Sequence, residues 1–491
     1  MSVQVFLQGK IAGIEEFLAA PSGGGESLRP PSEMCLLGRS RWVTLLSEIL
    51  PRALLAELGL ARLLLGSSGG GQFIIVLPQE MLPQAEQFMN SAAEEVWRLS
   101  SGHLRLITAA TENLGDWSVV RRRLAEELAP KLAAPAAAAG LGFFEESAGN
   151  ADPSVESYFT ETLALDFPAA GAAGWSPEHP GRVLLNGGKH VWPLTGGPAA
   201  PETISLARHT AASEDGHRPA TRQELAERAQ GRKTFGVLRG DVDSLGIRLR
   251  RLQSIEEHVQ LSVMYKQFFA GELEVVCSLP EFWRKATVLY SGGDDFAVYG
   301  SWDALIPLAR EIQRLFHRFC EENLKELPGP EGKTITMAIA LARDPEESLA
   351  AIFQQAGRLL NLAKSSGKDC IHVLGQTLEW RQLAAASDLR ETMLRMAGEL
   401  EHPRRFLADL DAFYRKAAAA GSLTGARGRR LEKPWQVQRH LARALGETRE
   451  KELQKLKNHL TNEILARSAT QVRVRPGGRL ALEWARLLAE V

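Results

Sequence analysis

The 491-residue sequence has few cysteines, no excess of charge and no long apolar run. Its four cysteines, Cys35, Cys277, Cys320 and Cys370, stand far apart, so no CxxC pair is available for a zinc site and no disulfide framework is indicated. No stretch approaches the roughly 18 apolar residues of a membrane span, and the N-terminus lacks a basic region followed by an apolar one. We therefore expect a cytoplasmic protein without a membrane partner.

The charges nearly cancel, with 58 Lys and Arg against 59 Asp and Glu, so no overall field attracts nucleic acid. This balance hides two opposite parts. Residues 376–491 hold 22 Lys and Arg and 14 Asp and Glu, a net charge of +8, and the rest of the chain carries −9. Basic helices can meet phosphate or an acidic partner helix, but a solvated helix face explains any single Lys or Arg there equally well.

The order of predicted elements occurs twice, which indicates an internal duplication. The first copy reads as a strand at 3–7, a helix at 42–58, a hairpin of 61–65 and 73–77, a helix at 80–99 and a strand at 104–109. The second reads as a strand at 235–239, a helix near 253–271, a hairpin around 291–296, a helix near 303–325 and a strand at 334–341. The alignment places Gly9-Lys10 against Gly240-Asp241, and Ser68-Gly-Gly-Gly-Gln-Phe73 against Ser291-Gly-Gly-Asp-Asp-Phe296.

Four parts are therefore expected in an α+β chain. The two copies occupy 1–125 and 233–375, and between them the Ala- and Pro-rich start and broken periodicity of 126–232 indicate an irregular linker or insert. Residues 376–491 are helical by pattern, with Leu453, Leu456, Leu460 and Ile464 spaced along one helix face.

The most informative residues are acidic and lie in the second copy. Asp241 and Asp243 follow a buried strand, and Asp294 and Asp295 follow two glycines at a hairpin tip. If the strand lies beside the hairpin, these carboxylates converge and repel one another unless cations lie between them. Two magnesium ions satisfy such an arrangement and support in-line nucleotidyl transfer. The alternative is that these carboxylates are only a solvated strand end and an acidic hairpin turn. It is less favoured because the two motifs occur together in a duplicated frame.

A lysine pair follows the predicted helix at 346–364. Lys364 and Lys368 of Lys-Ser-Ser-Gly-Lys can neutralise a triphosphate, although lysine near a helix C-terminus is also favoured by the helix dipole. His372 lies in an apolar strand and reads as a packed residue, and no histidine in the sequence is followed by Asp.

Several motifs resemble, in the same order, those of the large subunit of type III CRISPR effector complexes (the Csm/Cmr large-subunit family). They are Gly236-Val-Leu-Arg-Gly-Asp-Val-Asp-Ser-Leu-Gly246 and the Ser291–Phe296 hairpin in the second half, and Leu7–Phe17, Leu37-Gly-Arg-Ser40 and Ser68–Phe73 in the first. The similarity runs from about residue 3 to 375. It implies two ferredoxin-like palm domains, a non-catalytic first palm and a second palm with a GGDD active site, followed by the helical C-terminal domain.

The resemblance also implies an activity, the synthesis of cyclic oligoadenylates from ATP when target RNA binds. Asp241, Asp294 and Asp295 would be catalytic and, with Asp243, would hold Mg²⁺ or Mn²⁺. Groups near the nucleotide would be Ser291, Gly292, Gly293, Lys364, Lys368, Ser68 and Gly69. The first palm has Lys10 and Gly71-Gln72 in place of the carboxylates.

The implied partners are guide RNA, target RNA and the other complex subunits. The small subunit would contact the C-terminal helical domain, and the guide-binding backbone and cap subunits would complete the assembly. Two family features are missing from this sequence: an HD nuclease with its His-Asp pair, and a four-cysteine zinc site between the palms. We therefore expect no DNA cleavage and a linker stabilised without zinc.

Two other functions remain open. The same palm could join AMP to another small-molecule acceptor, or cyclise GTP as GGDEF-type enzymes do, although the duplicated palm argues against a free-standing GTP cyclase. Alternatively, the chain is mainly a scaffold for guide and target RNA, a role in which the full carboxylate set would be unnecessary.

Overall fold

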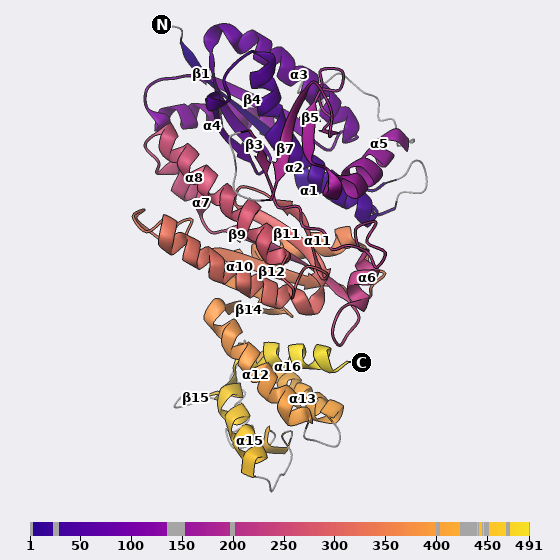
Figure 1. The fold of residues 1–491 in the computed structure, drawn as a ribbon. Coiled ribbons are helices and arrows are strands. Elements are labelled where there is room, and N and C mark those ends of the chain that lie inside the picture. The colour runs from indigo at the N-terminus through magenta and orange to yellow at the C-terminus, as the bar shows by residue number, and fades with distance from the viewer. Residues whose placement is uncertain are drawn as a thin grey trace.

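The structure is a computed structural model that describes residues 3–22, 29–134, 153–196, 202–398, 403–422, 439, 441–443, 445, 451–467 and 472–490. Figure 1 shows the first palm at the top, the second palm below it and the C-terminal helices at the bottom. The two palms meet along a broad junction, to which the long helix α2 (Glu33–Glu57) contributes from the first palm.

The first palm is a four-stranded antiparallel sheet covered by helices, with strand order β2-β3-β1-β4. Its elements are β1 (Gln4–Ala12), α1 (Ile14–Ala19), α2 (Glu33–Glu57), η1 (Arg62–Leu64), β2 (Leu65–Gly69), β3 (Gln72–Pro78), η2 (Gln79–Met81), α3 (Leu82–Leu99), β4 (Arg105–Glu112) and α4 (Trp117–Ala133). Helix α2 is buried around nearly its whole circumference, as its apolar sequence requires.

The second palm repeats this topology in a six-stranded sheet of order β10-β11-β9-β12-β13-β14. Its elements are β9 (Phe235–Val242), α7 (Leu245–Arg250), α8 (Ile255–Gln267), the π-helix η6 (Phe268–Glu272), α9 (Leu273–Cys277), β10 (Ala286–Ser291), β11 (Asp295–Ser301), α10 (Trp302–Asn323), β12 (Ile335–Leu341), α11 (Leu349–Ser366), β13 (Cys370–Val373) and β14 (Gln376–Glu379). In the first palm β3 of the hairpin pairs with β1, and β1 pairs on its other side with β4. In the second palm β11 of the hairpin pairs with β9, and β9 pairs on its other side with β12.

The registers of the two sheets support the duplication. Gly9 lies opposite Phe73 in the first palm, and Gly240 lies opposite Phe296 in the second. A Cβ atom at Gly9 or Gly240 would lie 2.3 or 2.4 Å from the opposing ring, so each glycine makes room for an aromatic side chain. The next pair along the strands is Lys10–Gln72 in one palm and Asp241–Asp295 in the other.

The first hairpin differs from the expected one. Residues 62–64 form a 3-10 turn instead of a strand, and β2 extends through the glycine-rich segment to Gly69. Gly70 and Gly71 alone make the turn, with φ of 59° and 73°, because a two-residue type I′ turn needs left-handed backbone at both positions. Helix α2 also starts earlier than residue 42, since the Ser32 hydroxyl accepts a hydrogen bond from the Cys35 amide and caps it.

The segment expected to be irregular has a small sheet of its own. Its described residues form α5 (Pro153–Ser157), η4 (Tyr158–Asp166), η5 (Phe167–Ala169), β5 (Ala172–Trp175), β6 (Leu184–Leu185), β7 (His190–Thr195), β8 (Ile204–Ser205) and α6 (Arg222–Glu227), with strand order β6-β5-β7-β8. It packs on the first palm, where Arg41 of α2 donates hydrogen bonds to the carbonyls of Leu163 and Ala164. Helix α4 crosses the boundary predicted at 125/126.

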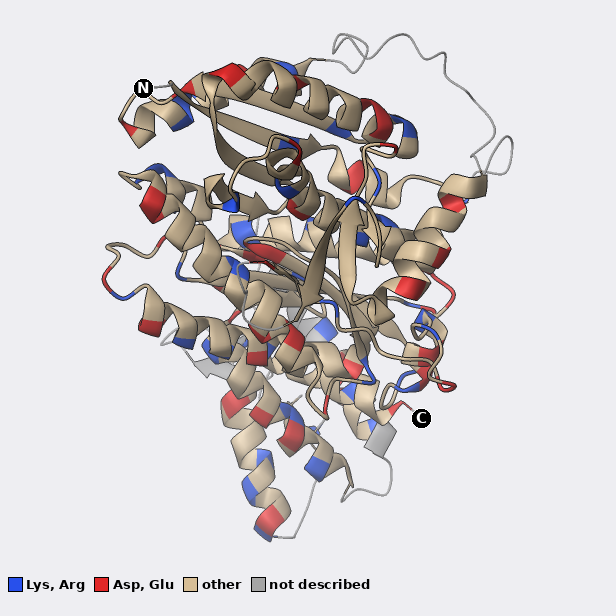
Figure 2. Cartoon of the chain, turned by 45° about the horizontal axis from the view of Figure 1, so that its top comes forward, with Lys and Arg blue, Asp and Glu red and all other residues tan. Residues whose placement is uncertain are grey.

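The C-terminal part consists of α12 (Trp380–Gly398), α13 (Pro403–Ser422), α15 (Lys451–Ile464), the hairpin β15 (Leu465–Arg467) and β16 (Val472–Val474), and α16 (Pro476–Ala489). Because β14 pairs with β13, the boundary predicted at 375/376 falls inside a hairpin of the second palm. Lys and Arg are mixed with Asp and Glu along the described helices of this part (Figure 2). None of the described helices is long and apolar enough to cross a membrane.

Candidate active site at the tip of the second hairpin

Three predicted carboxylates come together at one edge of the second palm. Asp241 near the end of β9 lies directly opposite Asp295 at the start of β11. Asp294 lies in the turn that joins β10 to β11. The turn is fastened to β9 because the Val242 amide donates to the Asp294 carbonyl oxygen at 2.9 Å. Lys364, from the last turn of α11, forms an ion pair with Asp241. This part of the predicted site is therefore assembled from β9, the hairpin and α11.

The electrostatics of this cluster disfavour three ionised carboxylates. Burial raises the pKa of Asp294 to about 7, and repulsion from Asp295 and Asp241 adds to the rise. Burial and the Asp241 charge likewise raise the pKa of Asp295 to about 6, although Arg239 and the Tyr290 hydroxyl lower it in part. The pKa of Asp241 is also raised, chiefly by burial, against the opposing effect of Lys364. The nearby basic groups thus leave the negative charge incompletely compensated.

The donor set fits Mg²⁺, although the side chains are not gathered around a cation. Among the described residues no group of three or more His, Cys, Asp or Glu side chains is arranged to hold a metal ion, and Asp241 is turned towards Lys364. Magnesium needs only one or two carboxylates and takes its other ligands from water and substrate phosphates. Burial and the neighbouring carboxylates raise the pKa values of Asp294 and Asp295, and a cation bound there would favour their ionised forms.

Asp243 lies apart from this cluster in its contacts. Its Oδ1 accepts a hydrogen bond from Thr336 Oγ1, and its Oδ2 accepts from Thr334 Oγ1 and the Asp369 amide. The residue is 3% exposed. These bonds join the end of β9 to β12 and to the loop after α11. Asp243 was predicted to bind metal, and in the structure its carboxylate instead makes these structural hydrogen bonds.

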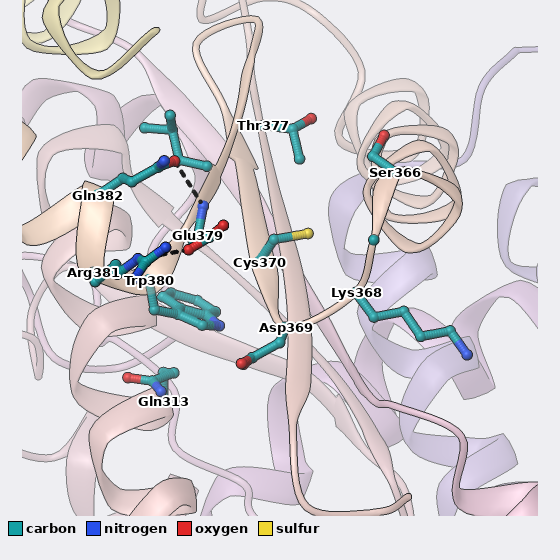
Figure 3. A pocket seen from close by; sticks show the side chains of 12 residues that line it. Gln313, Ser366, Lys368, Asp369, Cys370, Thr377, Glu379, Trp380, Arg381 and Gln382 are labelled. Carbon is teal, nitrogen blue, oxygen red and sulfur yellow. Dashed lines mark hydrogen bonds and ion pairs between the residues drawn. The ribbon is translucent and has the colours of Figure 1, made fainter. Parts of the chain in front are cut away.

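The second predicted lysine is also separated from the carboxylates. Lys368 donates to the Ser244 hydroxyl at 2.7 Å, and in Figure 3 its side chain points away from the pocket that its loop lines. That pocket, of about 680 Å³, lies between the loop after α11, the β13–β14 hairpin and the start of α12. Its Trp380 and Gln313 side chains lie across the pocket from Ser366. Of the two lysines, only Lys364 is paired with a predicted catalytic residue.

The tips of the two hairpins meet across the palm junction. A Cβ atom at Gly70 would lie 3.6 Å from the Gly293 amide nitrogen, and one at Gly69 would lie 3.7 Å from it. The serine hydroxyls predicted near the nucleotide already have protein partners. Ser68 donates to Glu48 Oε2 at 3.0 Å, and Ser291 donates to the Phe269 carbonyl oxygen at 2.9 Å.

A cavity of about 220 Å³ lies between the palms, beside Asp295. Residues from α1, α2 and both hairpins line it, together with Arg239, Tyr290 and Phe353. The Arg239 guanidinium lies over the Phe353 ring at 4.4 Å and donates to Glu15 of the first palm. Its Nε and Nη1 atoms are buried and have no hydrogen-bond partner among the residues that the structure describes.

Sequence reasoning missed four charged or polar residues around the site: Glu48, Lys266, Arg239 and Tyr290. Arg239 could have been found, because the two-residue period of a strand places it on the same face as Asp241. Glu48 is the only acid in the interior of α2, whose other two glutamates are its first and last residues, and an acid amid buried apolar residues indicates a buried partner without identifying it. Only the fold brings Lys266 to it, across 218 positions of sequence.

The arrangement is suited to chemistry on a polyanion. Carboxylates that bind hard cations, a lysine at the same edge and glycines that permit close approach of a ligand are the groups that phosphoryl chemistry requires. The first palm supplies glycines at the opposing tip but has Lys10 and Gln72 at the carboxylate positions.

Comparisons with known proteins agree with this reading of the fold. Residues 234–372 match the family model "Cas10/Cmr2, second palm domain". The chain is similar to the "CRISPR system single-strand-specific deoxyribonuclease Cas10/Csm1 (subtype III-A)" of Mycobacterium tuberculosis, with 24% identity over 464 residues that cover 76% of this chain and 54% of the relative. The protein of the same name from Methanocaldococcus jannaschii is 34% identical over 111 residues, 19% of this chain and 14% of that protein.

Solved structures show the same fold. The crystal structure of an apo Csm1–Csm4 cassette superposes with a TM-score of 0.70 at 18% identity, covering 99% of this chain and 70% of that one. Csm1 of T. onnurineus superposes with a TM-score of 0.69 at 17% identity, covering all of this chain and 70% of that one. The chain spans about half the length of its M. tuberculosis relative. Residues 234–372 thus resemble the second palm of Cas10/Cmr2 proteins, and the chain is similar to the Cas10/Csm1 proteins of subtype III-A CRISPR systems.

Proposed function

We propose that this chain is the nucleotidyltransferase subunit of an RNA-guided type III complex and makes cyclic oligoadenylates from ATP when target RNA binds. The observation that carries the proposal is the convergence of Asp241, Asp294, Asp295 and Lys364 at a hairpin tip that faces a second, carboxylate-free hairpin. Structural neighbours at 18% identity are Csm1–Csm4 cassettes in complex with AMPPNP, cA3 and cA4.

In the proposed reaction, the 3′-hydroxyl of one ATP attacks the α-phosphorus of another. A new P–O bond forms and the hydroxyl proton passes to solvent water, while the bond from the α-phosphorus to the oxygen that bridges to the β-phosphate breaks and pyrophosphate leaves with the electron pair. Asp294, Asp295 and Asp241 would hold Mg²⁺, which supplies charge neutralisation at the phosphates. Lys364 would exchange its bond with Asp241 for a phosphate oxygen, and the Gly292-Gly293 backbone would let the nucleotide approach closely.

Asp243, Ser68 and Ser291 have positioning roles in this proposal, because all three side chains are hydrogen-bonded to other parts of the protein. The Asp243 carboxylate holds the strand end and the loop of Lys368 in place through three hydrogen bonds. The first palm would hold one nucleotide without contributing metal ligands. We also propose that the chain assembles with a Csm4-like cap subunit, backbone and small subunits, guide RNA and target RNA.

The deoxyribonuclease activity named for the relatives is not part of the proposal, because no histidine in this sequence is followed by Asp. The experiment is product analysis by mass spectrometry. The assembled complex is incubated with mixed nucleotides, Mg²⁺ and cognate or mismatched target RNA, and cyclic oligoadenylates are expected only with the cognate RNA. Products joining AMP to another acceptor would favour the alternative transferase.

A matched variant separates catalysis from assembly. Asp294→Ala combined with Asp295→Ala is expected to abolish product while the complex still assembles on guide RNA. A wild-type complex that assembles, binds target RNA and releases no nucleotide product would refute the enzyme and leave the scaffold role.

A further inference from the structure

A buried ionic cluster joins the two palms behind the hairpin tips. Lys266 of α8, in the second palm, donates to Glu48 Oε2 of α2, in the first palm, at 2.5 Å. The same Glu48 oxygen accepts from Arg52 at 2.8 Å and from the Ser68 hydroxyl at 3.0 Å. Lys266 also lies 3.2 Å from Ser68 Oγ, to which it donates. The second palm is therefore bonded to the first hairpin, through Lys266 and Ser68.

The same helix also holds the second hairpin. Helix α8 continues without a break into the π-helix η6, where the Phe269 carbonyl oxygen accepts the hydrogen bond of Ser291. Phe269 lies three positions after Lys266 in the same continuous helical segment, so one segment contacts the equivalent serines of both hairpins. A π-turn inside a helix is an uncommon and often functional distortion, and here it supplies one of those two contacts.

The consequence is geometric. The two serines lie one and two residues from the glycines whose positions approach within 4 Å across the junction. Fixing both serines to one helix fixes the distance between the tips of the hairpins. If each palm holds one nucleotide, this distance also sets how the attacking hydroxyl meets the α-phosphate.

The cluster is poorly explained as a device for stability alone. The Glu48 side chain is 4% exposed and that of Lys266 is 19% exposed, and replacing buried ion pairs with apolar residues is often neutral or stabilising. Lys266, Arg52 and Ser68 outweigh burial and lower the pKa of Glu48 to about 2, so the carboxylate is ionised at neutral pH. A buried charge with partners in both palms specifies one register of the junction.

We propose that Lys266 is a positioning residue for the proposed nucleotidyl transfer, holding the first hairpin tip against the second through Glu48 and Ser68. This inference rests on the proposed function where it predicts a change in kcat. Its second prediction, the rate of disulfide formation between the hairpin tips, depends only on the junction. Within the described part of the chain, no hydrogen bond or ion pair joins Lys266 to the carboxylates at the second hairpin tip or to Lys364. Its effect therefore acts through the hairpins.

The test is Lys266→Met in the full chain within the assembled complex. Glu48 keeps Arg52 as its partner, so the variant is expected to fold. We expect kcat for oligoadenylate synthesis to fall about tenfold to a hundredfold, the loss that a misplacement of about 1 Å produces, while the Kd for a non-hydrolysable ATP analogue changes less than about twofold. The matched control is Lys285→Met, which removes a similarly buried ion pair with Asp303 inside the second palm, and should change kcat less than about twofold.

Equal kcat values in the two variants would overturn the proposal. So would a parallel loss of kcat, analogue binding and melting temperature in Lys266→Met, because that pattern indicates a structural role only. Restoration of activity by Lys266→Arg, which keeps a cation within reach of Glu48, would support positioning.

A second measurement is independent of catalysis. Cysteines introduced as Gly70→Cys and Gly293→Cys should form a disulfide under mild oxidation, because these positions adjoin across the junction; the four native cysteines are all buried. Adding Lys266→Met should slow disulfide formation at least about fivefold, and adding Lys285→Met should leave it unchanged. An unchanged rate with Lys266→Met would refute positioning, even if the wild-type complex made no product and the proposed function failed.

Discussion

Removing one of the crowded carboxylates should stabilise the folded protein in the absence of metal. Asp294 has its pKa raised from 3.8 to about 7 by burial and by repulsion from Asp295 and Asp241. A group whose pKa is higher in the folded than in the unfolded chain stabilises the fold when protonated. That contribution is complete below about pH 4 and is lost as the pH rises through 7. Asp294→Asn removes the charge and keeps the shape of the side chain.

The magnitude follows from the same values. At 1.36 kcal/mol for each pH unit, ionisation of Asp294 costs the folded state at most about 4 kcal/mol at pH 8. Asp294 is only partly buried, so solvent screens part of the repulsion and we expect a gain of about 1–2 kcal/mol for Asp294→Asn. For a domain of about 150–250 residues, the range nearest to the second palm, this gain corresponds to a rise in melting temperature of about 2–8 °C. At pH 5 the gain should be about a third as large.

The assay is thermal denaturation in EDTA at pH 5 and pH 8, with the exposed Asp388→Asn as a control. Added Mg²⁺ should raise the melting temperature of the wild type more than that of Asp294→Asn, because the ion relieves a repulsion that the variant lacks. A variant no more stable than the wild type at pH 8, or equally stabilised at both pH values, would show that the carboxylates do not repel as described.

Three further changes test other parts of the structure. Gly240→Ala should lower the free energy of unfolding by about 1–3 kcal/mol in urea titrations, because its Cβ would lie 2.4 Å from the Phe296 ring; an unchanged midpoint would contradict the packing. Lys364→Met should reduce kcat/KM for ATP about a hundredfold without lowering the melting temperature, and a normal kcat/KM would remove this lysine from the site. Glu48→Gln should cost about 3–5 kcal/mol by leaving Lys266 without a charged partner in the interior. Because the folded pKa of Glu48 is about 2, its contribution in the wild type should be lost as the pH falls from about 4.5 to 2, and Glu48→Gln should remove that acid sensitivity.

The duplication was predictable because both copies use the same local chemistry. A glycine opposite a phenylalanine and a glycine-rich hairpin recur at matching places, and the registers confirm the alignment of Gly9 with Gly240 and of Phe73 with Phe296. The first strand of the first hairpin was predicted four residues too early, because glycines read as a loop can extend a strand when the turn itself needs only two of them. The sheet within 153–232 escaped prediction because its strands are two to six residues long and interrupted by Gly and Pro.

The site was predictable where chemistry is local and unpredictable where it depends on the junction. Asp294 and Asp295 adjoin in sequence, and Asp241 reaches them through simple strand pairing. Spacing alone could not show that Asp243 turns to Thr334 and Thr336, since those threonines lie about 90 residues away. Nor could it show that Lys266 reaches Glu48.

The joining of both hairpins in one polypeptide has a kinetic consequence. Two separate palms would have to meet by diffusion, and their activity would fall steeply on dilution. Here the partner tip is always within reach at a fixed effective concentration, and the junction at Glu48 is formed within a single chain. Formation of the contact between the two hairpin tips is therefore a first-order process, and the specific activity of the proposed complex should not depend on its concentration.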